Sequence, residues 1–202
     1  MAQVYYKRLS NQIDAGQFEA VLARLPDAKQ QQLLRRNPSI RRNSLALYAF
    51  LNEVLSENPN YPALESLRFD ERGWPHWPEG DATPPAWLSL SHSREWLAVA
   101  ISRVGPVGVD VEQLRGQTAQ TFKRYFHDDE LAWAGDDPQR FLQLWTAKEA
   151  VAKAEGQGVL SMKKWLVFPT KNQVQACDGE QVWGLENYWV DCEACVALVS
   201  TL

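Results

Sequence analysis

The stretch Val107-Gly108-Val109-Asp110-Val111-Glu112 determines how the chain arranges its most chemically suggestive residues. Apolar and acidic residues alternate along it, which is typical of a β-strand with one buried face. Because successive side chains of a strand point to opposite faces, the three valines share one face, and Asp110 and Glu112 project together from the other. The sequence therefore predicts a strand that presents two carboxylates on one side.

A second stretch, Trp145-Thr146-Ala147-Lys148-Glu149-Ala150-Val151-Ala152-Lys153, is expected to be helical. Glu149 and Lys153 then lie one turn apart on the same side of the helix. Asp137-Pro138 gives a suitable start for this helix, and Gly156 a suitable end. Together the two stretches offer three carboxylates and a cation, a set that suits a polyphosphate with its divalent metal.

The overall composition is that of an ordinary soluble protein. The chain has 202 residues, 45% of them hydrophobic and 23% charged, with a net charge of −4. This charge argues against a protein that wraps nucleic acid, although a local basic patch is still compatible with it. No apolar run approaches the roughly 20 residues that cross a bilayer, and the N-terminal residues lack the apolar segment of a secretory signal. We expect a cytoplasmic protein of one large or two small domains.

Three cysteines are too few for a disulfide framework in a chain of this size. Cys192 and Cys195 form a C-x-x-C pattern, which also occurs in redox and zinc sites. They lie in what we expect to be a terminal strand, where residues three apart face opposite sides. No second pair of cysteines or histidines with ligand spacing accompanies them, so a structural role is favoured over metal binding.

The first part of the chain predicts one strand and two helices. Residues 4–8 are the strand candidate, one helix should begin near Pro26-Asp27 and reach Arg36, and Asn37-Pro38 should cap the second. Residues 58–62 should end this second helix. Its expected buried face consists of Ile40, Leu47, Phe50, Leu51, Val54 and Leu55.

The remainder predicts mainly strands, apart from helix-rich residues 113–136 and the helix that begins at Asp137. Residues 67–85 are rich in turn formers, and two apolar strands follow at 87–90 and 96–101. We place Ser91-His92-Ser93 in the turn between these two strands. Near the C-terminus, Asp178-Gly179 predicts a hairpin turn.

Each half of the sequence thus contains an opening stretch, a helix and antiparallel-looking strands. The strand endings at 97–102 and 195–200 are faintly similar. A duplicated α+β unit of about 100 residues fits this pattern. We therefore expect an α+β fold with an N-terminal half at 1–104 and a C-terminal half at 105–202, the latter carrying the acidic motifs.

Each motif taken alone has a simpler explanation. The carboxylates fit either a magnesium site or a solvated strand face with a weak Glu149–Lys153 helix pair. His92 fits either a phosphate contact or a surface turn, and a serine hydrolase is disfavoured because no G-x-S-x-G elbow is present. One basic cluster fits either a phosphate monoester, which arginine binds well, or a solvated helix face: Lys29, Arg35, Arg36, Arg41 and Arg42.

Five segments taken together resemble the 4'-phosphopantetheinyl transferase family, in its larger, monomeric, surfactin-synthetase-activating form. Their order and spacing agree with that family over residues 68 to 167. The segments are Gly73-Trp74-Pro75, Leu88-Ser89-Leu90-Ser91-His92-Ser93, Val107-Gly108-Val109-Asp110-Val111-Glu112, Tyr125-Phe126-His127-Asp128-Asp129-Glu130 and the Trp145–Lys153 stretch.

The resemblance implies transfer of the phosphopantetheine arm of coenzyme A to a serine of a carrier protein. Asp110, Glu112 and Glu149 match residues that hold Mg²⁺ on the coenzyme A pyrophosphate, with Mn²⁺ as the alternative cation. Glu149 also matches the expected general base, and Lys153 matches a residue that contacts the phosphate under attack. The family fold consists of two similar α+β halves about a pseudo-twofold axis, with the site between them.

The resemblance also implies a set of coenzyme A contacts. Family members usually carry a lysine where this chain has Trp74, which implies either a missing phosphate contact or stacking of Trp74 on the adenine. Carrier proteins of this kind are acidic, so Lys123 and Arg124 are expected docking charges. The expected coenzyme A contacts are Arg41, Arg42, Gly73, Trp74, Pro75, Ser91, His92, Lys148 and Lys153.

Two other functions remain open at this point. A degenerate family member would bind coenzyme A or a carrier protein without catalysis, and an unrelated metal-dependent hydrolase would use the same carboxylates. The expected partners are coenzyme A and an acidic acyl or peptidyl carrier protein of undetermined type. We expect a monomer without nucleic-acid or membrane partners.

Overall fold

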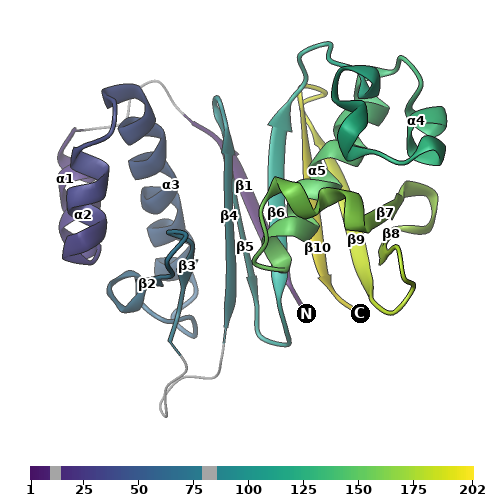
Figure 1. Cartoon of the computed structure of the whole chain (residues 1–202). Coiled ribbons are helices and arrows are strands. Elements are labelled where there is room, and N and C mark those ends of the chain that lie inside the picture. The colour runs from purple at the N-terminus through teal and green to yellow at the C-terminus, as the bar shows by residue number, and fades with distance from the viewer. Residues whose placement is uncertain (10–14, 79–85) are drawn as a thin grey trace.

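Two antiparallel sheets pack face to face at the centre of the molecule, and helices cover their outer faces (Figure 1). This arrangement is seen in a computed structural model that describes residues 1–9, 15–78 and 86–202. The first sheet has the strand order β1-β5-β4 and the second β6-β10-β9-β8-β7. The expected α+β class is confirmed.

The elements of the first half surround the smaller sheet. They are β1 (Gln3–Arg8), α1 (Ala15–Arg24), α2 (Asp27–Leu34), α3 (Pro38–Glu57), the 3₁₀ turn η1 (Leu64–Ser66), the short pair β2 (Arg68–Phe69) and β3 (Pro75–His76), β4 (Trp87–Ser93) and β5 (Trp96–Ser102). The elements of the second half are β6 (Val107–Gln113), η2 (Ala119–Tyr125), α4 (Asp128–Ala134), α5 (Pro138–Ala154), η3 (Val159–Lys164), β7 (Trp165–Phe168), η4 (Pro169–Lys171), β8 (Gln173–Ala176), β9 (Val182–Val190) and β10 (Ala194–Thr201).

Helix α3 covers the outer face of the first sheet. The side chain of Asn37 accepts a hydrogen bond of 3.0 Å from the backbone N–H of Ser39, so the expected cap of this helix is confirmed. Its apolar stripe packs against β5 in a core shared with α1 and α2. Ile40 is an exception, since 51% of it is exposed instead of buried. Helix α1 was not among the expected elements.

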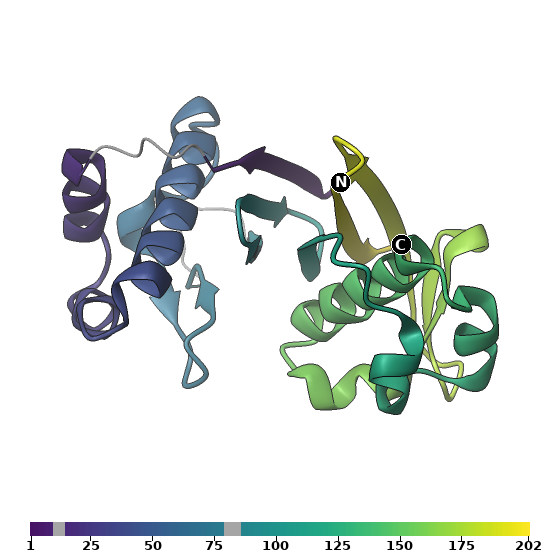
Figure 2. The same cartoon turned by 90° about the horizontal axis from the view of Figure 1, so that it is seen from above.

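The inner faces of the two sheets form a second, entirely apolar core. Val107, Val109 and Val111 of β6 lie in it against alanines of β5 and β10, which confirms that the three valines share one buried face. Seen from above, the two halves of the chain lie on either side of this central layer (Figure 2). The opposite face of β6 is therefore turned toward α5, where the acidic residues lie.

Helix α5 begins and ends where the sequence predicts. The Asp137 side chain accepts hydrogen bonds from the backbone N–H groups of Gln139 and Arg140, at 2.8 and 3.3 Å. After the helix, Gly156 has a φ of +65°, a conformation that glycine adopts at little cost. The expected hairpin near Asp178-Gly179 also forms, between β8 and β9, with Gly179 at φ +81°.

Two expectations about turns were wrong. Ser91, His92 and Ser93 belong to β4, which pairs with β5 as far as Ser93, and the turn consists of Arg94 and Glu95. The expected terminal strand around the C-x-x-C pattern is two strands joined by a turn.

Within that second turn, Cys192 is exposed with a φ of +57°, whereas Cys195 is buried in β10. The two thiols therefore have different surroundings, in line with a structural role. None of the helices in the described part of the chain combines the length and apolar character that a membrane crossing demands.

Candidate active site

A row of serines joins the edge strands of the two sheets. Ser89 and Ser91 of β4 accept hydrogen bonds from the backbone N–H groups of Val109 and Val111 of β6, at 3.0 and 3.4 Å. Because the two residues are two positions apart on β4, both hydroxyls point to the same neighbour. These bonds fix the register of β6 along β4. They thereby fix where Asp110 and Glu112 lie relative to the serines of β4.

The same row of serines orients the two carboxylates of β6. The Ser91 hydroxyl donates to Asp110 Oδ1 at 2.7 Å, and the Ser93 hydroxyl donates to Glu112 Oε2 at 2.5 Å. Ser91 is buried and both its donor and its acceptor capacity are used within the protein. In the structure Ser91 is therefore engaged with Asp110 and with the backbone of β6.

Gly108 brings α5 unusually close to β6. A Cβ atom at this position would stand 1.8 Å from the carbonyl oxygen of Ala150, well inside the contact distance of real atoms. Only glycine permits this approach. As a result, Glu149 and Lys153 of α5 stand over the face of β6 that carries Asp110.

Lys153 is the direct partner of Asp110. Its Nζ donates to Asp110 Oδ1 at 2.8 Å and to the backbone carbonyl of Val109 at 3.1 Å. Asp110 itself is only 4% exposed. Its second oxygen, Oδ2, is buried and finds no hydrogen-bond partner among the described residues. A buried carboxylate oxygen without a donor is costly unless a cation satisfies it.

The three carboxylates are close enough to repel one another. Burial, and then the charge of Asp110, raise the pKa of Glu112, while its hydrogen bond from Ser93 opposes the shift. Burial and the charge of Asp110 also raise the pKa of Glu149 to about 7, against the opposing influence of Lys153. A divalent cation bound between these carboxylates would lower this repulsion.

These residues fit a hard divalent cation in their chemistry. Mg²⁺ prefers carboxylate oxygens together with water and phosphate oxygens, and Asp110, Glu112 and Glu149 supply only oxygen donors. The unsatisfied Oδ2 of Asp110 is a buried acceptor of the kind that such a cation would satisfy. Across the described residues, no three acidic, histidine or cysteine side chains already stand in ligand geometry around one point. Lys153 meanwhile provides the compensating positive charge.

A cavity of about 320 Å³ opens directly beside the acidic cluster. Glu149 and Lys153 form its polar wall, and Trp74 and Leu88 belong to its apolar wall. The turn that contains Trp74 is held in place from both halves, because the Arg72 guanidinium donates to the carbonyl oxygen of Gly156 just beyond α5. Trp74 and Pro75 of this turn therefore line the cavity beside the acidic cluster, and Gly73 lines the neighbouring one.

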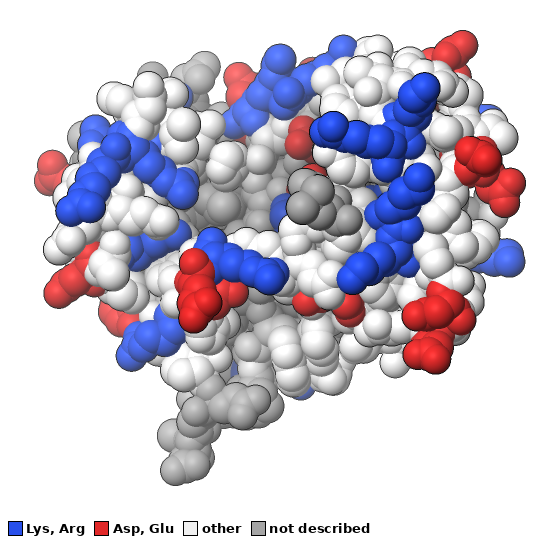
Figure 3. All heavy atoms as spheres, in the orientation of Figure 1, with Lys and Arg blue, Asp and Glu red and all other residues white. Residues whose placement is uncertain are grey.

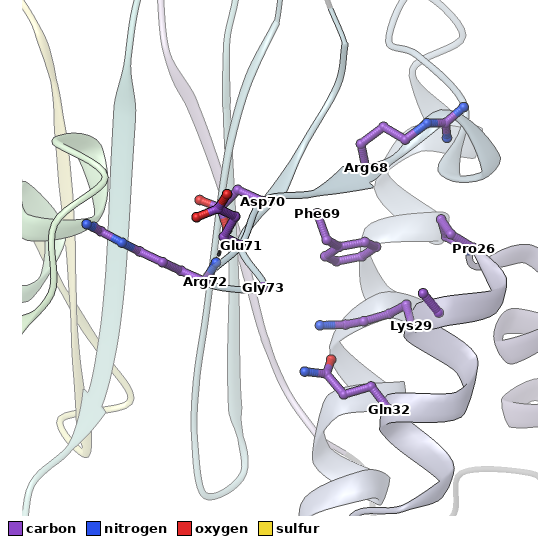
Figure 4. A pocket seen from close by; sticks show the side chains of 10 residues that line it. Pro26, Lys29, Gln32, Arg68, Phe69, Asp70, Glu71, Arg72 and Gly73 are labelled. Carbon is purple, nitrogen blue, oxygen red and sulfur yellow. Dashed lines mark hydrogen bonds between the residues drawn. The ribbon is translucent and has the colours of Figure 1, made fainter.

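A larger cavity, of about 450 Å³, lies on the other side of that turn, away from Asp110, Glu112 and Glu149. Figure 4 shows Lys29 and Gln32 of α2 pointing into it, toward Phe69 and the turn at Asp70. Lys29 is only 8% exposed, its amino group lies 4.3 Å from the centre of the Phe69 ring, and it has no ion pair with a described carboxylate. Burial, and then the charge of Arg36, lower the pKa of Lys29 to about 8.

Arg36 connects this cavity with His92. Its guanidinium donates to the Ser44 hydroxyl at 3.4 Å. Partial burial, followed by the charges of Lys153 and Arg36, lowers the pKa of His92. The cations Lys29 at the large cavity, Arg36, and Lys153 at the acidic cluster thus make up an electropositive zone, and His92 feels the charges of Arg36 and Lys153. In the sequence, Lys29 and Arg36 belong only to a general basic cluster, because nothing in the sequence shows that Arg36 lies near His92.

Three expected substrate contacts lie elsewhere. The guanidinium of Arg41 donates to the backbone carbonyl of Leu34 at 3.3 Å, and the exposed Arg42 follows it on the first turns of α3. Lys148 is completely buried, and its Nζ lies 2.9 Å from Glu130 and donates to the carbonyl oxygens of Met162 and Trp165. A side chain without exposed atoms does not reach a substrate phosphate, so the expectation for Lys148 was wrong.

Comparisons with known proteins agree with this geometry. The family described as the 4'-phosphopantetheinyl transferase superfamily matches residues 106–189, which include β6 and α5. The chain is 30% identical over 166 residues to the 4'-phosphopantetheinyl transferase gsp of Aneurinibacillus migulanus, covering 79% of this chain and 68% of that protein. It is 32% identical over 155 residues to the 4'-phosphopantetheinyl transferase AcpT of Salmonella typhi, covering 72% and 74% of the two chains.

A shorter alignment concerns the 4'-phosphopantetheinyl transferase Sfp of Bacillus subtilis (strain 168). It is 33% identical over 81 residues and covers 38% of this chain and 36% of that protein. The longer alignments extend over both halves of the fold, and the family match contains all three clustered carboxylates. The chain therefore belongs to the 4'-phosphopantetheinyl transferase superfamily and is a transferase enzyme of that family.

Proposed function

We propose that this enzyme transfers the 4'-phosphopantetheine arm of coenzyme A to a serine of an apo acyl or peptidyl carrier protein, leaving adenosine 3',5'-bisphosphate. The observation that carries the proposal is the buried cluster at the seam of the two sheets. There Asp110 Oδ2 lacks a partner, while Glu149 and Lys153 line a cavity of about 320 Å³. In the proposed complex, the N-terminal half (1–104) and the C-terminal half (105–202) lie on opposite sides of the substrate.

Asp110, Glu112 and Glu149 would hold Mg²⁺, and Mn²⁺ offers the same oxygen preference. When bound, the cation neutralises charge on the pyrophosphate as its bridging bond breaks. Ser91 and Ser93 keep two of these ligands in position through their hydrogen bonds of 2.7 and 2.5 Å.

The remaining steps belong to side chains of α5. Glu149 accepts the proton of the carrier serine hydroxyl, directly or through a water molecule, as that oxygen forms its bond to the β-phosphorus of coenzyme A. The bond from this phosphorus to the bridging oxygen breaks, and adenosine 3',5'-bisphosphate leaves. Lys153, which is 24% exposed at its side chain, contacts the phosphate under attack from the cavity wall.

The electropositive zone suggests where the other end of coenzyme A binds. Lys29 lines the cavity of about 450 Å³ and has no ion pair with a carboxylate of the described chain, and the charge of Arg36 acts on both Lys29 and His92. A phosphate monoester would supply the missing negative charge. We therefore assign the 3'-phosphate to these residues in place of Arg41 and Arg42.

Trp74 occupies the turn between the two cavities, where the adenine would lie. Its ring is 3.9 Å from the position that a Cβ of Gly156 would take, so it is supported by the C-terminal half. A planar indole in this position offers stacking to a base instead of the charge of a lysine. This fits the absence of a lysine from the turn.

The carrier protein would approach the cleft as an acidic partner. Lys123 and Arg124 are exposed on η2, and Lys163 and Lys164 are exposed on the neighbouring η3, so this side of the cleft can attract acidic side chains. We further propose that the enzyme acts as a cytoplasmic monomer without nucleic-acid or membrane partners.

Intact-mass measurement of a carrier protein tests the proposed function. The enzyme is incubated with coenzyme A, Mg²⁺ and apo carrier proteins of the fatty-acid, polyketide and nonribosomal-peptide types. A gain of one phosphopantetheine on any carrier supports the transfer. No gain on any of them, with coenzyme A still bound, supports the non-catalytic alternative, and cleavage of coenzyme A without a change in the carrier supports a hydrolase.

A further inference from the structure

Arg115 is joined to the acidic cluster through a serine hydroxyl. Its Nη2 donates to the Ser93 hydroxyl oxygen at 3.1 Å, and that hydroxyl donates to Glu112 Oε2 at 2.5 Å. The same Nη2 lies 3.6 Å from Glu112 Oε2, three residues earlier in the chain. Ser93 is only 4% exposed, so these contacts are largely shielded from water. Arg115 therefore contacts a proposed cation ligand without itself belonging to the ligand set.

Ser91 and Ser93 of β4 use their hydroxyls in the same way, but with different donors. Each donates its proton to one carboxylate of β6, and each accepts one N–H. For Ser91 this N–H belongs to the backbone of Val111, whereas for Ser93 it belongs to the Arg115 side chain. Arg115 follows just beyond the end of β6 and takes the place of a backbone donor. While Arg115 donates to it, the Ser93 hydroxyl keeps its only proton for Glu112.

The two carboxylate oxygens of Glu112 differ as a result. Oε2 receives the hydrogen bond from Ser93 and faces the Arg115 guanidinium, whereas no hydrogen bond among the described residues reaches Oε1. The Glu112 side chain is 29% exposed, so Oε1 is open to a cation. A carboxylate held in this way offers a metal one oxygen. Bidentate binding would also need Oε2, and its charge-assisted contact with Arg115 would then be lost.

The number of oxygens that one carboxylate supplies distinguishes two common hard cations. Mg²⁺ demands near-ideal octahedral geometry, whereas Ca²⁺ accepts a larger, looser shell that includes both oxygens of one carboxylate. Figure 3 shows Lys and Arg side chains on both sides of the hollowed middle of this face of the molecule. Their field repels both cations alike, because it depends on the charge of an ion and not on its size. The choice between the two cations therefore depends on how the ligands are arranged.

We propose that Arg115 is a positioning residue that, through Ser93, restricts Glu112 to binding by one oxygen and so favours Mg²⁺ over Ca²⁺. This proposal rests on the proposed function in one respect, the assignment of Glu112 as a cation ligand. Loss of the guanidinium frees Oε2, so that Glu112 can bind a larger cation with both oxygens. A purely electrostatic role predicts a different result, because removal of one positive charge strengthens the binding of both divalent cations by the same factor.

Three variants of the full chain separate orientation from charge. Arg115→Ala removes the guanidinium, whereas Arg115→Lys keeps a single donor nitrogen, which is all that the contact with Ser93 uses. Arg140→Ala is the matched control, because Arg140 lies 3.7 Å from Asp137 in another i,i+3 ion pair, outside the acidic cluster. Circular dichroism verifies that each variant is folded.

Metal binding to the free enzyme, without coenzyme A or a carrier protein, gives the readout. Mn²⁺ is titrated into the protein while electron paramagnetic resonance measures the unbound ion, and Mg²⁺ or Ca²⁺ then displaces the bound Mn²⁺. For Arg115→Ala we expect the Kd of Mg²⁺, divided by the Kd of Ca²⁺, to rise roughly tenfold above the wild-type ratio. Arg115→Lys and Arg140→Ala should keep the wild-type ratio.

Three results would overturn the proposal. The first is an unchanged ratio for Arg115→Ala, even with both constants altered, because charge alone would then explain the effect. The second is an equal rise for Arg115→Lys, since the contact with Ser93 would not be the cause. The third is a wild type without a displaceable Mn²⁺ site that Asp110→Ala removes.

These measurements are independent of phosphopantetheine transfer. A shifted ratio in an enzyme that modifies no carrier protein supports the role of Arg115 and removes the proposed function. An unchanged ratio in an enzyme that modifies a carrier protein does the reverse.

Discussion

Gly108 of β6 and Ala150 of α5 are in such close contact that a Cβ atom on the glycine would lie 1.8 Å from the alanine carbonyl oxygen. No rearrangement of a flexible side chain relieves this contact, because the obstructing atoms belong to the helix backbone. The glycine therefore sets the distance between the strand that carries Asp110 and Glu112 and the helix that carries Glu149 and Lys153.

Substitution of Gly108 by alanine should displace α5 from the sheet. We expect the free energy of unfolding to fall by about 2–4 kcal/mol, because overpacking against backbone forces a shift of the whole element. Urea denaturation measures the loss. Gly158→Ala is the control, since nothing lies within 4 Å of a Cβ at that position and its φ is not positive. A Gly108→Ala chain as stable as this control would show that the contact is not tight.

Replacement of Lys29 by methionine should stabilise the free enzyme at neutral pH. Burial lowers the pKa of Lys29 from 10.5 to about 8, so the folded chain binds fewer protons than the unfolded chain between these values. The cost of burying the charged amine is therefore greatest below pH 8 and disappears as the pH rises toward 10.5. Denaturation at pH 7 should show Lys29→Met more stable by ~2 kcal/mol, with a smaller difference at pH 10. An equal difference at both pH values would contradict this explanation.

The same variant should bind coenzyme A more weakly. We expect a roughly tenfold rise in Kd at pH 7, since a charge-assisted contact to the 3'-phosphate is lost. Dephospho-coenzyme A, which lacks that phosphate, is the matched ligand and should bind both proteins equally. For the wild type, the preference for coenzyme A should decline above pH 8 as Lys29 loses its proton. If Lys29→Met raises the Kd of coenzyme A and of dephospho-coenzyme A to the same extent, the 3'-phosphate binds elsewhere.

Lys148 should affect stability more than substrate binding. It forms a buried ion pair with Glu130, and Glu130 also accepts hydrogen bonds from the backbone N–H groups of His127 and Val167. Lys148→Met leaves the Glu130 carboxylate buried without its cation, so we expect a loss on the order of 3 kcal/mol in the free energy of unfolding.

The matched control for this substitution is Lys171→Met, at an exposed lysine on η4. At a temperature where both proteins stay folded, the KM for coenzyme A should equal that of the wild type. A selective rise in this KM for Lys148→Met would restore the substrate contact that the sequence suggests.

Regular periodicity made much of this fold predictable. The valine alternation of β6 and the caps of α3 and α5 are local signals, and each was confirmed. Helix α1 carried such a signal as well, because Phe18, Val21, Leu22 and Leu25 repeat at helical spacing. The burial of Lys148 could also be predicted from the sequence. It precedes Glu149 by one residue, and helical spacing places it on the buried side of α5 with Leu144 and Val151.

Contacts between distant segments could not be predicted in this way. The placement of His92 depends on β4 continuing to Ser93, because its serines bind β6 instead of ending in a turn. The approach of Arg36 to His92 depends on how α2 and α3 pack over the first sheet. Local sequence carries neither relationship, so the neighbourhood of Asp110, Glu112 and Glu149 could be expected from periodicity, whereas their basic surroundings could not.

The central claim is that the acidic cluster transfers phosphopantetheine, and the mass of a carrier protein tests it most directly. Wild type, Asp110→Ala and Glu149→Ala are each incubated with coenzyme A, Mg²⁺ and an apo carrier that the wild type modifies, with Glu180→Ala as a control at an exposed carboxylate. Circular dichroism verifies that all four are folded. We predict that the wild type and Glu180→Ala add one phosphopantetheine, while the carrier mass stays unchanged with Asp110→Ala and Glu149→Ala. Normal transfer by either of these two variants would contradict the account.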